Sequence, residues 1–271
     1  MRVARPMHTF RVRKACTAFV FGTLLTTFAR DGQSQATPSP KRVLHVSAAA
    51  DLLPVMPALA QNYEHSTGVK LIVTTGSSER QVARIEAGDP ADIFLGADFT
   101  YPEKLIAGGL ADAKAPVAYA NGTLVLFAQK DSPLQPLNLE RLQDRRLQKL
   151  AVADRLLEPF GRATAAALTR LKLFESLSPK FVVAEDVTRV GALVESGEAQ
   201  LGFISLTLAR SDHYKMIGSY ILVPESQYPV IKEYAVVLRK GDTAEAHRFL
   251  NWLLSSDVQT KLPNLGLNPV H

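Results

Sequence analysis

Short apolar runs alternate with segments of helical periodicity along most of the chain. Apolar runs bounded by polar residues or glycine predict strands, and apolar residues repeated every three or four positions predict helices. A regular alternation of the two indicates an α/β fold with mixed, mostly parallel sheets. The predicted strands are residues 43–46, 69–74, 93–95, 124–128, 150–153, 201–204, 221–223 and 234–238.

Helices are predicted between most of these strands. Apolar residues from Leu52 to Tyr63 repeat with helical spacing, but Pro54 and Pro57 cannot both lie inside a regular helix. We therefore expect this helix to be regular from about Val55, where Pro57 falls in the first turn. The clearer predicted helices are residues 79–87, 160–171, 187–196 and 244–254.

The first 36 residues have the three-part pattern of a secretory signal peptide. Residues 2–14 are basic, residues 15–28 are mostly apolar, and Ser34 and Ala36 place small residues before a cleavage site. The apolar run is too short to span a membrane, although a retained N-terminal anchor is the alternative interpretation. We expect a periplasmic protein that is secreted through a cleaved signal peptide. Its one cysteine, Cys16, lies in the leader, so the mature chain needs no disulfide.

The net charge changes once the leader is removed. Of the 31 basic and 26 acidic residues, six and one lie in residues 1–36, which leaves 25 of each and a formal net charge of zero. The isoelectric point of about 9.3 therefore comes from the leader. It gives no indication of a nucleic-acid or membrane partner. The mature chain is long enough for one large or two small domains.

Three segments end an apolar run and open a helical pattern. They are residues 46–52, 75–78 and 184–187. A strand that turns directly into a helix places unpaired backbone N–H groups and the positive end of the helix dipole at one point. Such points bind anions. With small residues around them and no Lys or Arg, these segments predict a site that encloses a small oxyanion.

Five segments in this order carry a resemblance to a known family. They are SAAADL (47–52), GSS (76–78), IEAGDPADIFLGAD (85–98), AEDV (184–187) and VESGEAQLGF (194–203). Together they resemble the periplasmic molybdate-binding proteins of bacterial ABC importers, and the resemblance runs from about residue 43 to residue 268.

The resemblance implies a two-lobed periplasmic-binding-protein fold of type II, with crossover strands between the lobes. One lobe would comprise residues 43–120 plus 231–271, and the other residues 121–230. The two lobes would close on one tetrahedral oxyanion held by neutral donors, and a membrane permease would be the partner. The resemblance implies that the protein is not an enzyme and holds no cofactor apart from the transported ligand, molybdate or tungstate. We expect a monomer.

The resemblance also implies the site residues, position by position. Asp51 stands where the family has its first ligand-holding serine, and Ser78 retains the second. Backbone N–H donors map to Phe160 and Val187. Ser205 stands where the best-known members donate a tyrosine hydroxyl. Asp51 and Ser205 depart from the family pattern, and both departures bear on selectivity.

Asp51 matters most, because an ionised carboxylate would repel a dianion by several kcal/mol at short range in a water-poor pocket. Three interpretations are open. Asp51 caps the following helix and turns away from the ligand, its oxygen bonded to the N–H groups of Leu53 or of the residue after Pro54. Alternatively, Asp51 is protonated and donates a hydrogen bond to the anion. In the third interpretation, it coordinates the metal centre of the ligand directly.

Simpler roles for these residues and other functions for the protein are alternatives to this site. Ser77, Ser78 and Asp186 are well placed as helix caps, and neither His45 nor His213 has a partner at metal-ligand spacing. A secreted serine hydrolase is disfavoured, because the GSS segment lacks the Gly-x-Ser-x-Gly motif. Sulfate, a phosphonate or an organic acid is an alternative ligand, although organic acids usually recruit arginine. Tungstate has nearly the size and charge of molybdate, so the sequence does not separate the two.

Overall fold

The structure, a computed structural model, describes residues 42–270. Residues 1–36, the predicted signal peptide, lie outside the described residues. The strands of the first sheet are β1 Val43–Ala49, β2 Lys70–Gly76, β3 Ile93–Gly96, β4 Val117–Gly122 and β10 Ile231–Val237. The strands of the second sheet are β5 Leu124–Gln129, β6 Leu150–Ala153, β7 Phe181–Ala184, β8 Leu201–Ser205 and β9 Gly218–Leu222.

The two sheets have corresponding topologies. Their strand orders are β2-β1-β3-β10-β4 and β7-β6-β8-β5-β9. In each sheet four strands share one direction and the fourth in the order, β10 or β5, pairs antiparallel with both neighbours. The chain passes from one sheet to the other between β4 and β5 and returns between β9 and β10. This confirms the predicted class, a two-lobed α/β fold with mixed sheets and crossover strands.

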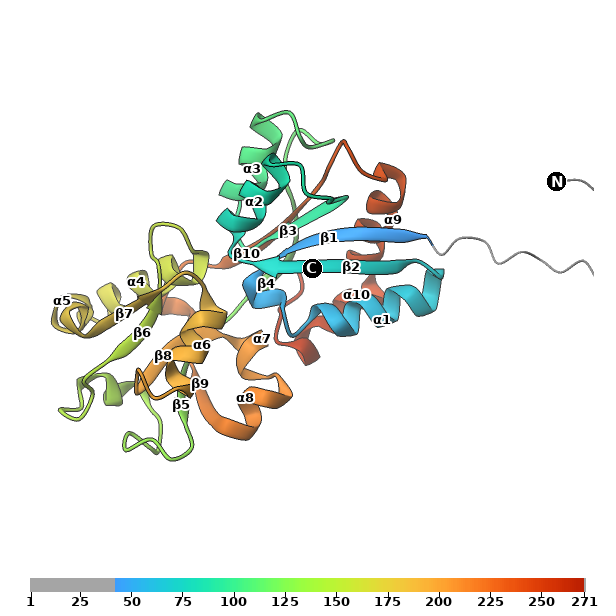
Figure 1. Cartoon of the computed structure of the whole chain (residues 1–271). Helices are drawn as coiled ribbons and strands as arrows, with labels where there is room; N and C mark the ends of the chain where they lie inside the picture. The colour runs from blue at the N-terminus through green and yellow to red at the C-terminus, as the bar shows by residue number, and fades with distance from the viewer. Residues whose placement is uncertain (1–41, 271) are drawn as a thin grey trace, which may run out of the picture. The chain divides into compact units, whose positions relative to one another are not determined.

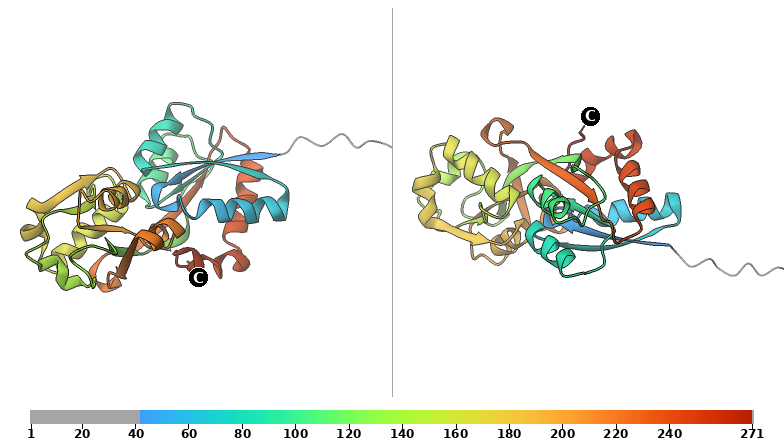
Figure 2. Two further views of the ribbon diagram at one scale, coloured as in Figure 1. Left: turned by 60° about the horizontal axis from the view of Figure 1, so that its bottom comes forward. Right: turned by 90° about the horizontal axis from the view of Figure 1, so that it is seen from above.

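Helices cover both faces of each sheet, as Figures 1 and 2 show. The helices of the first sheet are α1 Met56–Thr67, α2 Ser78–Glu86, α3 Thr100–Ala107, α9 Thr243–Leu253 and α10 Ser256–Gln259. The helices of the second sheet are α4 Pro159–Arg170, α5 Phe174–Leu177, α6 Val187–Glu195, α7 Leu206–Ala209 and α8 Asp212–Ile217. We call the first sheet with its helices the first lobe and the second sheet with its helices the second lobe. Short 3-10 turns, η1 Ala50–Leu52, η2 Leu139–Gln143, η3 Ser178–Lys180, η4 Glu225–Gln227 and η5 Leu262–Leu265, complete the elements.

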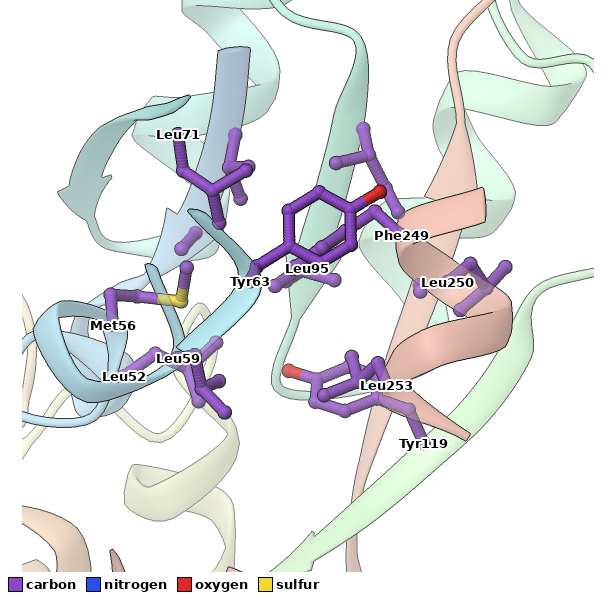
Figure 3. Close-up of a cluster of buried hydrophobic side chains, with 14 of the residues drawn as sticks. Leu52, Met56, Leu59, Tyr63, Leu71, Leu95, Tyr119, Phe249, Leu250 and Leu253 are labelled. Carbon is purple, nitrogen blue, oxygen red and sulfur yellow. The ribbon is translucent and has the colours of Figure 1, made fainter. Parts of the chain in front are cut away.

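The largest core cluster of the first lobe lies between its sheet and helices α1 and α9 (Figure 3). The ring of Tyr63 packs edge-on against Phe249, with 5.0 Å between ring centroids. Its hydroxyl donates to Glu245 Oε1 at 2.5 Å, which satisfies the polar end of the buried ring. Leu59, one turn earlier on α1, is buried in the same cluster, and such a side chain contributes about 1.5–3 kcal/mol. These residues share the helical spacing that predicted α1, which begins at Met56 with Pro57 in its first turn.

Two strands, β4 and β7, were not predicted from the sequence. The residues of β4 include alanine, asparagine and glycine, which have weak strand propensity, and they are ordered by pairing with β10. Strand β7 is a four-residue edge strand that pairs only with β6 among the described strands. In both cases neighbouring strands decide the conformation, which local composition does not reveal.

Candidate functional site

Asp51 lies in η1, directly after β1, and is buried. The interpretation that it caps the next helix is wrong. Ala49 is the N-cap of η1, Val55 is the N-cap of α1, and neither position has a side-chain cap. The N–H groups of Leu53 and Val55 bond to backbone carbonyls in the turn. Because the chain turns before α1 begins, the unpaired donors of that helix lie beyond the reach of Asp51.

The carboxyl group of Asp51 instead lies near that of Glu233 on β10, close enough for the charge of Asp51 to raise the pKa of Glu233. Both residues are buried. Asp51 Oδ2 and Glu233 Oε1 receive no hydrogen bond from a donor group of the described residues, so each buried oxygen is left unsatisfied. Burial raises the pKa of Asp51 to about 7, and burial and the charge of Asp51 raise the pKa of Glu233 well above its usual range.

Ser78 is the first residue of the nine-residue helix α2. The preceding Ser77 is the actual cap, since its Oγ accepts from the N–H of Arg80 at 3.3 Å. The hydroxyl of Ser78 is buried and has no hydrogen-bond partner within residues 42–270. An unpaired buried hydroxyl costs about 1–3 kcal/mol, so its retention at a helix N-terminus indicates a place for an acceptor.

Gln81 lies one turn further along α2 and was missed by the sequence analysis. Its Oε1 accepts from Ser47 Oγ at 2.8 Å and from Thr74 Oγ1 at 3.3 Å. Its Nε2 is buried without an acceptor among the described residues. The signal was present, because Gln81 falls on the buried side of an amphipathic helix with Val82 and Ile85.

Phe160 is the second residue of α4, and the helix is capped by Glu158. Glu158 Oε2 accepts from the N–H of Gly161 at 2.8 Å. The N–H of Phe160, the donor that the resemblance assigns to a ligand, lies one residue before the N–H that Glu158 caps. Burial, followed by the charges of Asp51 and Asp186, raises the pKa of Glu158 to about 8.

Val187 is the first residue of α6, where the helix supplies no acceptor for its N–H. Asp186 is the cap, as predicted, and accepts from the N–H of Arg189 at 2.9 Å. Its side chain also accepts from the hydroxyl of Thr188. The Val187 N–H therefore remains a candidate donor for a ligand.

Ser205 ends β8 and caps the short helix α7. Its Oγ accepts from the N–H of Leu208 at 3.3 Å and lies 2.7 Å from Thr207 Oγ1. Because Thr207 Oγ1 donates to the backbone carbonyl of Asp51 at 2.6 Å, the hydroxyl hydrogen of Ser205 is directed to Thr207. The hydroxyl of Ser205 is thus engaged by Thr207 and Leu208, and Thr207 in turn contacts Asp51 of the other lobe.

Contacts between the lobes surround these residues. Ser77 Oγ donates to Glu185 Oε1 at 3.0 Å, and Tyr101 Oη donates to the carbonyl of Leu157. Asp98, after β3, forms an ion pair with Arg162 of α4. These contacts join segments next to Ser78, Phe160 and Val187, and Thr207 links Ser205 to Asp51, so the five predicted residues lie close to contacts between the lobes.

The charge of the site is unusual for an anion site. Within residues 42–270, no Lys, Arg or His forms a hydrogen bond or ion pair with Asp51, Glu158 or Glu233. The described residues contain no group of three or more His, Cys, Asp or Glu side chains suited to a metal ion. Glu233 was missed by the sequence analysis, although alternation with Ile231 and Ala235 places it on the inward face of β10.

None of the helices in the described part of the chain combines the length and the apolar character that a membrane span requires.

Comparisons with known proteins agree with this architecture. The family described as bacterial extracellular solute-binding protein matches residues 44–267. The molybdate-binding protein ModA of Azotobacter vinelandii is 31% identical over 211 residues, which cover 78% of this chain and 83% of the relative. The solved periplasmic molybdate-binding protein of the same organism matches with a TM-score of 0.77 and 28% identity, covering 84% of this chain and 100% of the other. The chain therefore belongs to the bacterial extracellular solute-binding proteins.

A more distant relative has an enzyme's name. Aconitate isomerase of a Pseudomonas species is 25% identical over 243 residues, which cover 85% of this chain and 89% of the relative. The relatives of this chain thus include a protein named for a reaction as well as proteins named for molybdate binding.

Proposed function

We propose that the protein captures a tetrahedral oxyanion, molybdate or tungstate, between its two lobes and delivers it to the membrane permease of an ABC importer. The observation that carries this proposal is the Ser78 hydroxyl. It is buried and unpaired at the N-terminus of α2, beside the contact between Ser77 and Glu185 of the other lobe. A hydroxyl and a helix N-terminus together suit an oxyanion.

Neutral donors would hold the anion. Ser78 and the amide of Gln81 would donate from the first lobe, and the backbone N–H groups of Val187 and Phe160 from the second. Charge spread over such dipoles holds an anion without a counter-ion and lets it leave again. Asp51 would border the ligand with its carboxyl group. The ligand role predicted for Ser205 stays a prediction, since its hydroxyl is engaged by Thr207.

The setting follows from the family and the leader. We propose that the chain acts in the periplasm as a monomer after cleavage of residues 1–36. Its lobes would comprise residues 43–120 plus 231–271 and residues 121–230. It would need no cofactor, no nucleic acid and no catalytic residue. Closure would occur by hinge motion where the chain passes between the sheets.

Calorimetry with molybdate, tungstate, sulfate and phosphate tests the proposal. We expect molybdate and tungstate to bind with similar affinity and the smaller sulfate and phosphate to bind more weakly. Incubation with cis- and trans-aconitate and with an acyl ester is the matched test for turnover, and we expect none. Tight binding of sulfate or phosphate without molybdate would contradict the choice of ligand, and isomerisation or hydrolysis would contradict a pure binding role.

A further inference from the structure

Two carboxyl groups lie in contact on the first-lobe side of the site. Asp51 is 1% exposed and Glu233 is 0% exposed. Their carboxyl groups lie near each other, and each keeps an oxygen that no N–H or hydroxyl donor of residues 42–270 reaches. Two neighbouring buried carboxylates that no cation neutralises repel each other, so ionising both is unfavourable. The pair therefore holds at least one proton around neutral pH.

The groups that face this pair are acidic or neutral. They are Tyr119 of β4, Glu158 before α4, Asp186 before α6 and Asp98 after β3, whose charge is opposed by Arg162. Tyr119 Oη donates to Glu233 Oε2 at 3.5 Å, so it supplies a weak hydrogen bond and no charge. A bound dianion would add further negative charge beside the pair. Protonation is the remaining way to lower this repulsion, because the neighbouring side chains supply no cation.

We infer that Glu233 is a positioning residue of the oxyanion site, which shares one proton with Asp51, and that capture of a dianion takes up one further proton onto this pair. Once both groups are protonated, the pair is uncharged. One of its two O–H groups forms the bond between the carboxyl groups, and the other becomes a donor for the anion. The proton comes from water and returns to it on release. The inference rests on the proposed function, since it requires an oxyanion ligand.

The inference sets the pH dependence of binding. In the free protein the pKa of Asp51 is raised to about 7 by burial, so the pair carries two protons below this pH and one above it. The dianion favours the doubly protonated pair and raises this pKa further. Affinity is then constant well below pH 7 and falls by up to about tenfold for each pH unit above it, until the pH reaches the pKa of the complex.

Calorimetry of the purified protein with molybdate from about pH 5.5 to about pH 9 tests this. Repeating the titration in two buffers of different ionisation enthalpy counts the protons taken up. We expect about one proton per molybdate near pH 8 and nearly none near pH 5.5. Molybdate remains a dianion over this range, so the uptake reports on the protein.

Three variants locate the proton. Asp51→Asn should bind molybdate with no proton uptake and a flat pH profile, because the amide donates without titrating. Glu233→Gln removes the neighbouring acid and donates to Asp51, so affinity should begin to fall at a lower pH while binding near pH 5.5 stays close to wild type. Glu158→Gln is the matched control. It keeps an acceptor for the cap of α4 and should retain the uptake.

Several results would overturn the inference. Molybdate binding by wild type with no proton uptake would do so and leave the proposed function intact. So would equal weakening of Glu233→Gln at every pH, or an uptake that survives in Asp51→Asn and is lost in Glu158→Gln. If Glu233→Gln does not fold, the result for Asp51→Asn decides alone. If wild type binds neither molybdate nor tungstate at any pH, the proposed function and the inference both fall.

Discussion

The two lobes place similar residue types at the site but use them differently. Within the described residues, all buried side-chain atoms that lack a hydrogen-bond partner belong to the first lobe: Asp51 Oδ2, Ser78 Oγ, Gln81 Nε2 and Glu233 Oε1. In the second lobe, Glu158, Asp186 and Ser205 each accept a backbone N–H at the start of a helix. In the proposed site, the first lobe would therefore offer the side chains of Ser78 and Gln81 to a ligand, and the second lobe would offer backbone donors around side chains that already bond to the protein.

This difference shows how a helix cap affects the availability of a polar group. A serine or an acid at the cap position uses a side-chain oxygen to accept a hydrogen bond from a backbone N–H of the helix. Ser78 lies one residue after its cap, Ser77, and so keeps its hydroxyl free. Ser205 is itself the cap of α7, so its hydroxyl oxygen is already engaged by the helix.

The largest expected effect concerns Asp51 and the free energy of unfolding. Its pKa is raised to about 7 on folding, so its contribution to stability is present below its ordinary pKa and is lost as pH rises through 7. Wild type should lose up to about 4 kcal/mol between about pH 4 and pH 8 relative to Asp51→Asn. Urea unfolding of both proteins across this range measures the difference. If the free energies of unfolding of wild type and Asp51→Asn change with pH in the same way, burial does not raise the pKa of Asp51.

The next effect concerns ligand affinity in the first lobe. Ser78→Ala removes an unpaired hydroxyl donor to a charged ligand and should weaken molybdate binding by about 1.5–3 kcal/mol, roughly tenfold to a hundredfold. The melting temperature without ligand should hold or rise, because no existing hydrogen bond is lost. Calorimetry and thermal unfolding measure the two quantities. An unchanged dissociation constant would remove Ser78 from the site.

The second lobe should respond in the opposite way. Ser205→Ala removes the cap of α7 and the bond to Thr207, and should lower the free energy of unfolding by about 1 kcal/mol. Molybdate affinity should stay within about threefold, less than the 1.4 kcal/mol of a tenfold change, since Thr207 can still donate to Asp51. The same two assays serve here. A loss of affinity as large as that of Ser78→Ala would mean that the lobes do not differ in the proposed sense.

The smallest effect is expected at the exposed contact between the lobes. Glu185→Gln keeps an acceptor for Ser77 and removes the charge that faces Arg80 at 4.0 Å. Both charged side chains are more than half exposed, so the pair should contribute under about 0.5 kcal/mol and affinity should change less than about twofold. A titration at low and moderate salt checks this. A larger change would show that closure depends on surface charge more than on the buried site.

Local pattern was sufficient for most of the fold. The strand later seen as β6 was predicted at residues 150–153, and the helices α2, α4, α6 and α9 were predicted within one residue at each end. These elements have strong periodicity and clear end signals, so neighbouring residues determine them. The cap role of Asp186 was also visible, because a cap bonds to an N–H group only a few residues away.

The sequence did not reveal which groups surround the polar side chains of the site. A cap was one of three interpretations open for Asp51, but its carboxyl group lies near Glu233, which is 182 positions later in the sequence, on β10. Ser205 was expected to face the ligand, yet its hydroxyl is directed into the contact between Thr207 and Asp51. A side chain's partner, and with it the protonation of a buried acid, depends on groups that only the folded chain brings within hydrogen-bonding distance. Residue type and local spacing can nominate a site, but desolvation and pairing in three dimensions decide the charge that the site carries.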